Sequence, residues 1–381
     1  MGKLNWIKKA CGIFLLCTMA AIALPAQTTG DAPAGPIFTL LHSFDRTDGA
    51  TPRAGLVQGT DGKFYGTTAA GGAGGGCYHA GCGTVFKITP SGTLTTLHSF
   101  DGIDGSSSFA GLVQGTDGKF YGTTASDGGN GAGTVFQITP TGTLTTLYNF
   151  DGTDDSGSFA GLVQGADGNF YGTTSSGGGN NGHCPLGCGT TFKISPSGSM
   201  MASRNFDTTV GASPEAALIQ ATDENFYGTT LEGGANNAGT VFKITPGGTL
   251  MMLYSFCSQS ICADGYYPQG VLIQATDGKF YGTTSEGGAS DDGTVFSLSV
   301  GIGPFVETLP AFGKVGTPVH ILGTNLTGTT SVTFDGTPAT FTVVSKTLVF
   351  TNVPAGATTG TVQVVTPGGT LSSNVNFQVL P

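Results

Sequence analysis

The phrase GLVQGTDGKFYGTT occupies residues 55–68 and returns, with small changes, at residues 111–124, 161–174, 217–230 and 271–284. Counted from the aspartate at the centre of each copy, the steps are 56, 50, 56 and 54 residues. A period near fifty, built from short strands and glycine-rich turns, is typical of a β-propeller. The sequence therefore predicts that the chain before residue 300 is one array of five repeats.

Each repeat predicts four antiparallel strands, which we call A to D. In the first copy we expect them at residues 55–60, 63–68, 83–89 and 93–100. Asp-Gly, a strong hairpin signal, separates A from B, and a turn of the Pro-Ser-Gly type separates C from D. The fourth copy has Asp223-Glu224 instead of Asp-Gly, and we expect strain in that turn.

The two ends of the array are complementary in sequence. The fifth repeat ends at residue 299 without a D strand, while the chain opens with IFTLLHSFD (37–45), which matches the D strand TLTTLHSFD (93–101). We expect the N-terminal strand to complete the last blade and remove the free sheet edge. The prediction is an all-β, five-bladed β-propeller over residues 37–300; an open stack of hairpins and a ring shared by two chains are the alternatives.

A Gly/Pro hinge at residues 301–304 leads into a second pattern, which extends to residue 381. Short alternating strands separated by turn signals are what a small β-sandwich requires. The alternating apolar pairs are Val319 and Ile321, Val332 and Phe334, Phe341 and Val343, Val362 and Val364, and Val375 and Phe377.

Both regions resemble known families. The repeats, with GLVQGTDGKFYGTT, GTVFKITPSG and TLTTLHSFD, resemble the GloVer tandem repeat of exported bacterial proteins. The C-terminal residues, with PFVETLPAFGKVGTPVHILGTNL and VTFDGTPATF, resemble an IPT/TIG domain, which has an immunoglobulin-like fold. These resemblances imply a secreted or cell-surface protein, and they supply no catalytic residues.

The N-terminus predicts export. Lys3, Lys8 and Lys9 precede an apolar run at residues 10–24, and Ala26 offers a cleavage point, so we expect a signal peptide at 1–26 and a flexible leader at 27–36. An uncleaved anchor is the alternative, and no other stretch is apolar enough to cross a bilayer. Removal of the three lysines would leave 11 basic against 24 acidic side chains, which disfavours nucleic acid and anionic membranes as partners.

The six cysteines outside the predicted signal lie in loop insertions as three local pairs: Cys77 and Cys82, Cys184 and Cys188, and Cys257 and Cys262. In an exported chain this pattern predicts disulfides that stiffen loop tips. His79 and His183 raise metal binding as an alternative, but each loop is one ligand short of a closed zinc site. We expect disulfides and no resident metal.

Acidic residues of the D-to-A and B-to-C loops are the candidate ligand-binding groups. Pairs spaced D-x-x-D could offer oxygens to calcium, although a turn in which Asp caps its own backbone is the favoured interpretation. Glu232 and Glu286 begin equivalent B-to-C loops and could act as acid and base, although solvated loop acids are the default. The paired aspartates are Asp45 and Asp48, Asp101 and Asp104, and Asp151 and Asp154.

Strand direction places the D-to-A and B-to-C connections on one face, and that face carries every insertion. The sequence favours an extracytoplasmic, non-enzymatic binding or adhesion protein that uses this face for a glycan or a surface protein. A propeller hydrolase or lyase acting on carbohydrate, with the sandwich as accessory domain, is the alternative, and a structural role in an envelope layer remains open. The number of chains in the assembly is not predicted.

Overall fold

The computed structural model describes residues 40–73, 77, 81–152, 157–179 and 184–381. The predicted signal peptide and leader, residues 37–39 of the N-terminal strand, Asp154, His79 and His183 lie outside the described residues. Residues 41–381 form one compact unit of the chain. Among the described residues there is no α-helix, and a single 3-10 turn, η1 (Ser260–Cys262), lies within a cysteine loop. No described helix has the length and apolarity needed to span a bilayer.

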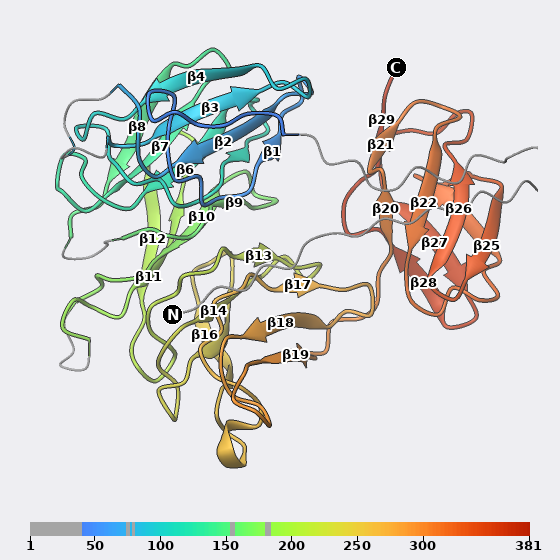
Figure 1. Ribbon diagram of the computed structural model, residues 1–381. Helices are drawn as coiled ribbons and strands as arrows, with labels where there is room; N and C mark the ends of the chain where they lie inside the picture. Colours follow the sequence, from blue (N-terminus) through green and yellow to red (C-terminus); the bar gives the residue numbers. More distant parts are fainter. Residues whose placement is uncertain (1–39, 74–76, 78–80, 153–156, 180–183) are drawn as a thin grey trace, which may run out of the picture. The chain divides into compact units, whose positions relative to one another are not determined.

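The repeats form five antiparallel sheets in which strands follow one another in chain order (Figure 1). Within the described residues, four of these sheets have four strands and the fifth has three. The strands are β1 (Val57–Gln58), β2 (Phe64–Thr68), β3 (Thr84–Ile88) and β4 (Leu94–Ser99); β5 (Val113–Gln114), β6 (Phe120–Thr124), β7 (Thr134–Ile138) and β8 (Leu144–Asn149); β9 (Val163–Gln164), β10 (Phe170–Thr174), β11 (Thr190–Ile194) and β12 (Met200–Asn205); β13 (Ile219–Gln220), β14 (Phe226–Thr230), β15 (Thr240–Ile244) and β16 (Leu250–Ser255); and β17 (Ile273–Gln274), β18 (Phe280–Thr284) and β19 (Thr294–Leu298).

The Asp of the repeated phrase organises its hairpin. Asp117 accepts hydrogen bonds from the backbone N–H of Lys119 at 3.1 Å and from the hydroxyl of Tyr121 at 2.9 Å. The glycine that follows, Gly118, has a φ of 80°, which glycine adopts without steric cost. The short turn and the buried tyrosine of the next strand are therefore fixed by one carboxylate.

The Thr of strand B and the Thr of strand C explain the rest of the phrase. The hydroxyls of Thr68 and Thr84 lie 2.9 Å apart, and the Thr84 N–H donates to the Thr68 hydroxyl. A Cβ on Gly83 would lie 2.2 Å from the Thr68 carbonyl oxygen, so only glycine fits before the second threonine. Both threonines are fully buried, and their mutual bond satisfies hydroxyls that would otherwise be costly to bury.

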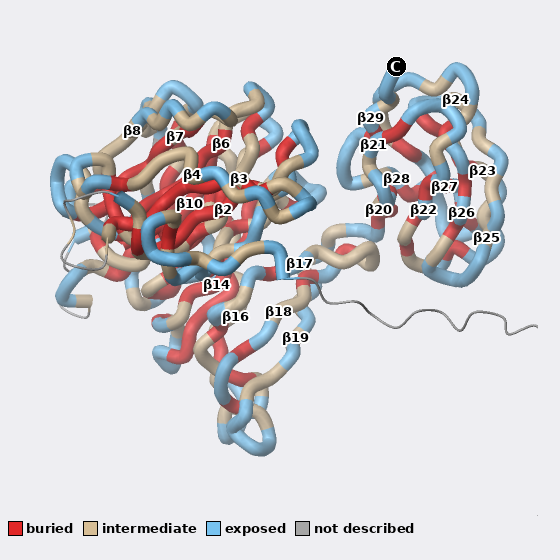
Figure 2. Tube along the Cα trace, turned by 45° about the horizontal axis from the view of Figure 1, so that its top comes forward, coloured by how far each residue is buried: buried red, intermediate tan, exposed pale blue. Residues whose placement is uncertain are grey.

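Neighbouring sheets make the same contacts at each step of the array. A strand B tyrosine stacks on the strand B phenylalanine of the next sheet, with ring centroids 3.8–4.2 Å apart in Tyr65–Phe120, Tyr121–Phe170, Tyr171–Phe226 and Tyr227–Phe280. A strand A glutamine accepts a hydrogen bond at 3.0 Å from the A-to-B turn of the preceding sheet, in Gln114–Thr60, Gln164–Thr116, Gln220–Ala166 and Gln274–Thr222. Figure 2 shows buried residues along the strands of these sheets.

The ends of the array differ from its interior. Phe44 packs edge-on against Phe86, as Phe100 packs against Phe136, so the segment before the first repeat contacts the first sheet as a preceding D strand would. Residues 40–44 nevertheless form no strand, and β19 has no D-strand partner among the described residues. Val295 of β19 is 80% exposed, whereas its counterpart Val85 is fully buried. The all-β prediction is confirmed, and within the described residues no strand pairing closes the sheets into a ring.

The C-terminal region forms two four-stranded sheets around one apolar core. One has the order β20-β22-β26-β25 and the other β24-β23-β27-β28, with β21 and β29 paired in parallel. The strands are β20 (Glu307–Leu309), β21 (Phe312–Gly313), β22 (Pro318–Leu322), β23 (Ser331–Phe334), β24 (Thr337–Pro338), β25 (Phe341–Ser345), β26 (Leu348–Asn352), β27 (Val362–Thr366), β28 (Gly369–Ser372) and β29 (Gln378–Val379).

The predicted alternation is correct for most of these strands. The residues predicted in β22, β23 and β27 are fully or almost fully buried in the core, and Phe377 joins them. Val375 is an exception, because it lies in a bend and is 50% exposed. The packing of two alternating sheets is the immunoglobulin-like sandwich that the sequence predicted.

Candidate functional site

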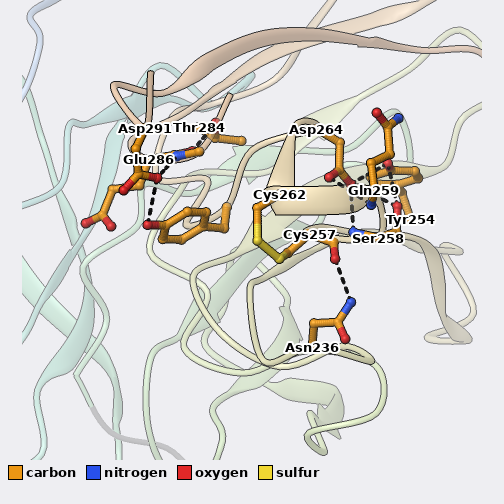
Figure 3. Close-up of a disulfide and its surroundings, with 12 residues drawn as sticks. Asn236, Tyr254, Cys257, Ser258, Gln259, Cys262, Asp264, Thr284, Glu286 and Asp291 are labelled. Atoms are coloured by element: carbon orange, nitrogen blue, oxygen red, sulfur yellow. Dashed lines mark hydrogen bonds between the residues drawn. A yellow bond between two sulfur atoms is a disulfide. The ribbon is translucent and has the colours of Figure 1, made fainter. Parts of the chain in front are cut away.

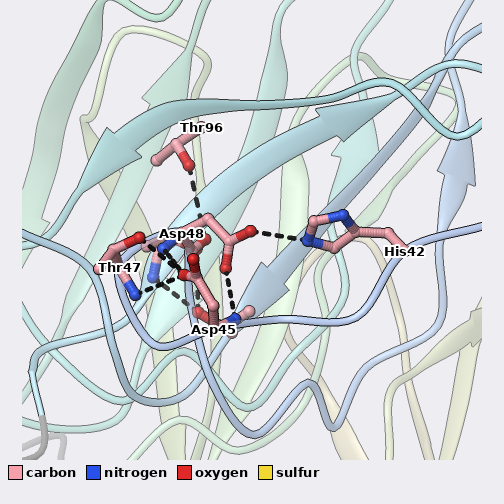
Figure 4. A network of polar contacts seen from close by, with 7 residues as sticks. His42, Asp45, Thr47, Asp48 and Thr96 are labelled. Atoms are coloured by element: carbon pink, nitrogen blue, oxygen red, sulfur yellow. Dashed lines mark hydrogen bonds and ion pairs between the residues drawn. The ribbon is translucent and has the colours of Figure 1, made fainter.

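The paired aspartates of the D-to-A loops form turns. Asp45 accepts hydrogen bonds from the Thr47 hydroxyl at 2.7 Å and the Thr47 N–H at 2.9 Å, and these bonds lower the pKa of Asp45 (Figure 4). Asp48 accepts from the Asp45 N–H and lies 2.6 Å from Nε2 of His42. Each carboxylate of the pair therefore holds the backbone of the other.

The second repeat reproduces this arrangement. Asp101 accepts from the N–H of Ile103 at 2.8 Å, and Asp104 accepts from the N–H of Asp101 and contacts His98. Burial raises the pKa of the Asp104 carboxyl, but the hydrogen bond from His98 and the Asp101 N–H outweigh it, so the pKa is lowered. Asp151 also has an interaction partner. In the part of the chain that is described, no group of three or more His, Cys, Asp or Glu is arranged to hold a metal ion.

Glu232 and Glu286 each interact within their own repeat. Both form backbone bridges, Glu232 with Ala212 and Glu286 with Tyr266. The Glu286 carboxylate also bonds to the Tyr266 hydroxyl, which raises the pKa of Tyr266, and Asp291 accepts from the same hydroxyl at 3.0 Å (Figure 3). The structure thus gives the two glutamates separate partners.

The six cysteines are joined as three local disulfides: Cys77–Cys82, Cys184–Cys188 and Cys257–Cys262. Cys82 and Cys188 are buried, and their carbonyl oxygens accept the N–H groups of Ser107 and Ser213, which lie in the D-to-A loops that lead into the next repeats. The third disulfide is tied to a neighbouring loop, since Asn236 donates to the Cys257 carbonyl at 2.7 Å (Figure 3). Two cysteine loops therefore support the backbone that enters the following repeat.

That backbone has an unusual conformation in all five repeats. Positive φ values between 53° and 65° occur at Thr51, Ser107, Gly157, Ser213 and Tyr267. Residues other than glycine rarely adopt positive φ values. The strained backbone costs such a residue about 1–3 kcal/mol. Two residues further on, the side chain that precedes strand A varies among the repeats: Arg53, Phe109, Phe159, Glu215 and Gln269.

Four of these side chains form what we call the RFFE strip (Arg53, Phe109, Phe159 and Glu215). The guanidinium carbon of Arg53 lies 5.0 Å from the centroid of the Phe109 ring. Phe109 and Phe159 stack with centroids 5.3 Å apart and planes inclined by 23°. The backbone segments just before β1 and β5 lie close enough together for these side-chain contacts, since a Cβ on Gly111 would lie 3.4 Å from the Gly55 carbonyl oxygen.

Glu215 continues the strip on the next repeat, where a Cβ on Gly161 would lie 3.8 Å from the Ala217 Cβ. Although the Glu215 side chain is exposed, surrounding protein displaces part of its water, and the negative charge of Glu232 adds to this effect. Both causes raise the pKa of Glu215. Glu232, which the sequence predicted as a candidate site residue, therefore interacts electrostatically with Glu215, which the sequence did not predict.

Family comparisons decide what the array is. The model of the Gloeobacter/Verrucomicrobia repeat matches residues 30–184 and 183–331, most of the chain. The chain belongs to the Gloeobacter/Verrucomicrobia repeat family. Residues 305–379 also match the model of the IPT/TIG domain, so both resemblances are confirmed.

Comparison with other proteins adds no activity to this family member. No curated protein matches the chain. A gluconolactonase from Xanthomonas campestris is 14% identical over 81% of this chain and 88% of that one, with a TM-score of 0.40. A putative 6-phosphogluconolactonase from Bacteroides uniformis is 15% identical over 82% and 88%, with a TM-score of 0.42. We draw no conclusion from similarities at this level.

The RFFE strip of this Gloeobacter/Verrucomicrobia repeat protein was missed by the sequence reasoning. The available signal was variation rather than a motif: the residue two positions before the first residue of the repeated phrase is Arg, Phe, Phe, Glu and Gln in the five copies. Side chains that change while both flanks repeat are free of the constraint that maintains the fold.

Proposed function

We propose that this is an exported, non-enzymatic binding protein whose D-to-A and B-to-C loops form the binding face for a glycan or a surface protein. One observation carries the proposal: the departures from the repeat gather in these loops, as the three cysteine insertions and the RFFE strip. A-to-B and C-to-D turns, by contrast, hardly vary. Loops that vary on a constant scaffold are where binding residues concentrate.

Export is supported by the chemistry of the chain. Local disulfides form and persist in oxidising compartments outside the cytoplasm. The predicted signal at residues 1–26 agrees with this, and an extracytoplasmic location at the cell surface or in the secreted fraction follows. The immunoglobulin-like domain would then act as a spacer or a second adhesive module.

Calcium enters the proposal only as a modulator of the loops. Asp45, Asp48, Asp101 and Asp104 already use carboxylate oxygens as turn acceptors, so a bound ion would have to share them with backbone N–H groups. Calcium takes six to eight oxygen ligands, more than one such pair offers. We therefore propose binding that persists when calcium is chelated.

We further propose that the five sheets close into a propeller ring. Each internal step buries a Tyr–Phe stack and a glutamine–turn hydrogen bond, and the two ends hold the unused halves of both contacts: Tyr281 with Phe64, and Thr276 with Gln58. Alignment with β3 and β4 pairs Val295 with His42, as Val85 pairs with His98. Residues 40–44 would then belong to a fourth strand beside β19.

A carbohydrate hydrolase or lyase is the second candidate. The observation that favours it is the interaction of Glu215 with Glu232, because burial and the negative charge of Glu232 raise the pKa of Glu215, and the general acid of a glycosidase needs a raised pKa. Glu215 carries the raised pKa and would be the acid.

A glycan array probed with the exported protein, in calcium and again in EDTA, tests the function, with reducing-end release measured on every bound glycan. We expect binding in both buffers and no release. Release that Glu215→Gln abolishes would replace the binding function by the hydrolase. Absence of glycan binding would leave a surface protein as ligand, to be sought by cross-linking on the producing cell. Absence from the extracytoplasmic fraction would contradict the proposal as a whole.

A further inference from the structure

The exposed ring of Phe159 in the RFFE strip contrasts with the strand B phenylalanines of the later repeats. Strand B phenylalanines such as Phe120 and Phe170 are fully buried, whereas Phe159 is 43% exposed. Burial of a phenylalanine side chain is favourable, and Phe159 forgoes part of this stabilisation in the free protein. Because Phe109 stacks on it, the two rings form one continuous apolar surface.

Polar groups of opposite charge flank this surface. Arg53 lies over Phe109, and Glu215 follows Phe159 on the next repeat. Among the described residues neither Arg53 nor Glu215 takes part in an ion pair. A guanidinium donates and a carboxylate accepts hydrogen bonds, so the strip offers both functions beside an aromatic platform.

The rings and charges are held by a stiff backbone. Ser107 and Ser213, two residues before Phe109 and Glu215, keep their positive φ because buried carbonyls of the disulfide loops accept their N–H groups at 3.0 and 2.8 Å. At these two positions little backbone freedom therefore remains to be lost when a ligand binds. Preorganisation of this kind lowers the cost of binding.

We propose that the RFFE strip is a subsite for an uncharged sugar ring of a polysaccharide. The apolar C–H face of the sugar would pack on Phe159 and Phe109, while its hydroxyls bond to Arg53 and Glu215. Glu215, Glu232 and the net charge of −10 oppose an acidic glycan, and Arg53 opposes a basic peptide. The inference rests on the proposed binding function and specifies its ligand class and residues.

The IPT/TIG domain provides a matched control. Phe350 is 40% exposed and stacks on His320 with centroids 4.4 Å apart, so it resembles Phe159 in exposure and in having a ring neighbour. A general loss of exposed aromatic surface would affect both positions alike. A sugar seated on the strip would be sensitive to Phe159 alone.

The test measures affinity of the full, exported chain for neutral glucans, xylans and mannans and for acidic pectin, by affinity electrophoresis. We compare the natural protein with Phe159→Ala, Arg53→Met and Phe350→Ala, each checked for an unchanged thermal transition. We expect a neutral polysaccharide to be retained, about tenfold weaker binding for Phe159→Ala, weaker binding for Arg53→Met, and no change for Phe350→Ala.

The outcomes separate the inference from the function beneath it. Binding that survives Phe159→Ala but is lost with Phe350→Ala overturns the strip and leaves a glycan-binding protein that uses its C-terminal domain. Preference for acidic pectin would also contradict the proposal that the strip binds an uncharged sugar, while it would still support the proposed glycan-binding function. If no polysaccharide is retained, the strip is not a sugar subsite, and the surface-protein arm of the preceding test decides the function.

Discussion

At the scale of single residues, the repeat holds its turns together with charged hydrogen bonds. Asp167 accepts from the Tyr171 hydroxyl at 2.8 Å and from the Asn169 N–H, and its carboxylate lies 2.8 Å from Nζ of Lys193. Burial raises the pKa of Asp167, but the bonds from Lys193, Asn169 and Tyr171 outweigh it and hold the pKa far below its ordinary value. The folded state is therefore stabilised by the ionised form.

This carboxylate predicts an acid-dependent loss of stability. The folded pKa of Asp167 is lower than the unfolded value of about 3.9, so its contribution is complete above that pH and is lost as the pH falls towards the folded pKa. We expect Asp167→Asn to cost about 1 kcal/mol at pH 7 and progressively less below pH 4. Urea unfolding between pH 7 and pH 3 measures this, with the exposed Asp292→Asn as control. Equal pH slopes for Asp167→Asn and the natural protein would contradict it.

A second residue-scale prediction concerns the strained turn of the fourth repeat. Glu224 has a φ of 64°, at the place where Gly62, Gly118, Gly168 and Gly278 have values of 77–83°, so the strain expected from the sequence is present. We expect Glu224→Gly to raise the free energy of unfolding by about 1 kcal/mol.

The mirror variant controls that experiment. A Cβ on Gly118 would meet no atom within 4 Å, so Gly118→Glu adds backbone strain without a clash. It should lower the unfolding free energy by a similar amount in the same denaturant titration. If both variants change stability in the same direction, the backbone explanation is wrong.

At the scale of elements, the disulfide loops act on the strand that follows them. The loop carrying Cys82 ends in a buried carbonyl that holds Ser107, while the cysteine-free loop of the second repeat uses Ala132 to hold Gly157 in the same way. Serine needs more support than glycine at a positive φ. The first disulfide therefore stabilises a local conformation more than the whole fold.

We accordingly expect different global and local effects from Cys77→Ser with Cys82→Ala. Closure of so short a loop is worth about 2 kcal/mol, so the thermal transition should fall by only a few degrees. Amide exchange at Ser107 should rise about tenfold or more, while exchange at Gly157 serves as the internal reference. Uniform acceleration across both repeats would show that the disulfide supports the fold as a whole.

Local sequence signals made most strands predictable, but they could not predict which distant strands pair with each other. Asp-Gly turns and alternating side chains act within one hairpin, so β2, β3 and their copies lie where expected. Strand A is shorter than expected, because only Val57 and Gln58 pair before the turn. Residues 40–44 match a D strand in sequence but form no strand in the structure. Their predicted partner lies some 250 residues away, and similarity to a D strand does not tell whether the pairing repays the entropic cost of closing so long a loop.

The candidate site was predictable only in part, for a related reason. The paired aspartates recur at the same spacing in successive repeats, so the sequence identified them. A feature that recurs in this way is more easily explained by the fold, which is common to the repeats, than by a binding site. Phe109, Phe159 and Glu215 belong to no motif, and the two rings become neighbours only when successive sheets pack side by side. A search for residues that break the repeat would have found them.

At the scale of the whole molecule, the two ends of the repeat array have different exposed surfaces that are complementary to each other. One end presents β19 with Val295 exposed, and the other presents Phe64, which is half-buried although its four counterparts are fully buried. Long, exposed sheet edges promote association with other chains, so proteins cover them. Closure within one chain covers both ends at once, and its partner is tethered at high effective concentration.

A pair of cysteines at His42 and Val295 tests this closure. Cross-strand Cβ atoms lie about 4.5–5.5 Å apart in antiparallel pairs, so His42→Cys with Val295→Cys should form a disulfide within one monomer if the ring closes in the β3–β4 register. Non-reducing electrophoresis and peptide mapping identify the product, with each single variant as control. Disulfide-linked dimers would instead indicate a ring shared between chains, because the segment before the first repeat then completes the sheet of a second copy. Free thiols under oxidising conditions would contradict closure and leave an open array whose β19 edge is available to another strand.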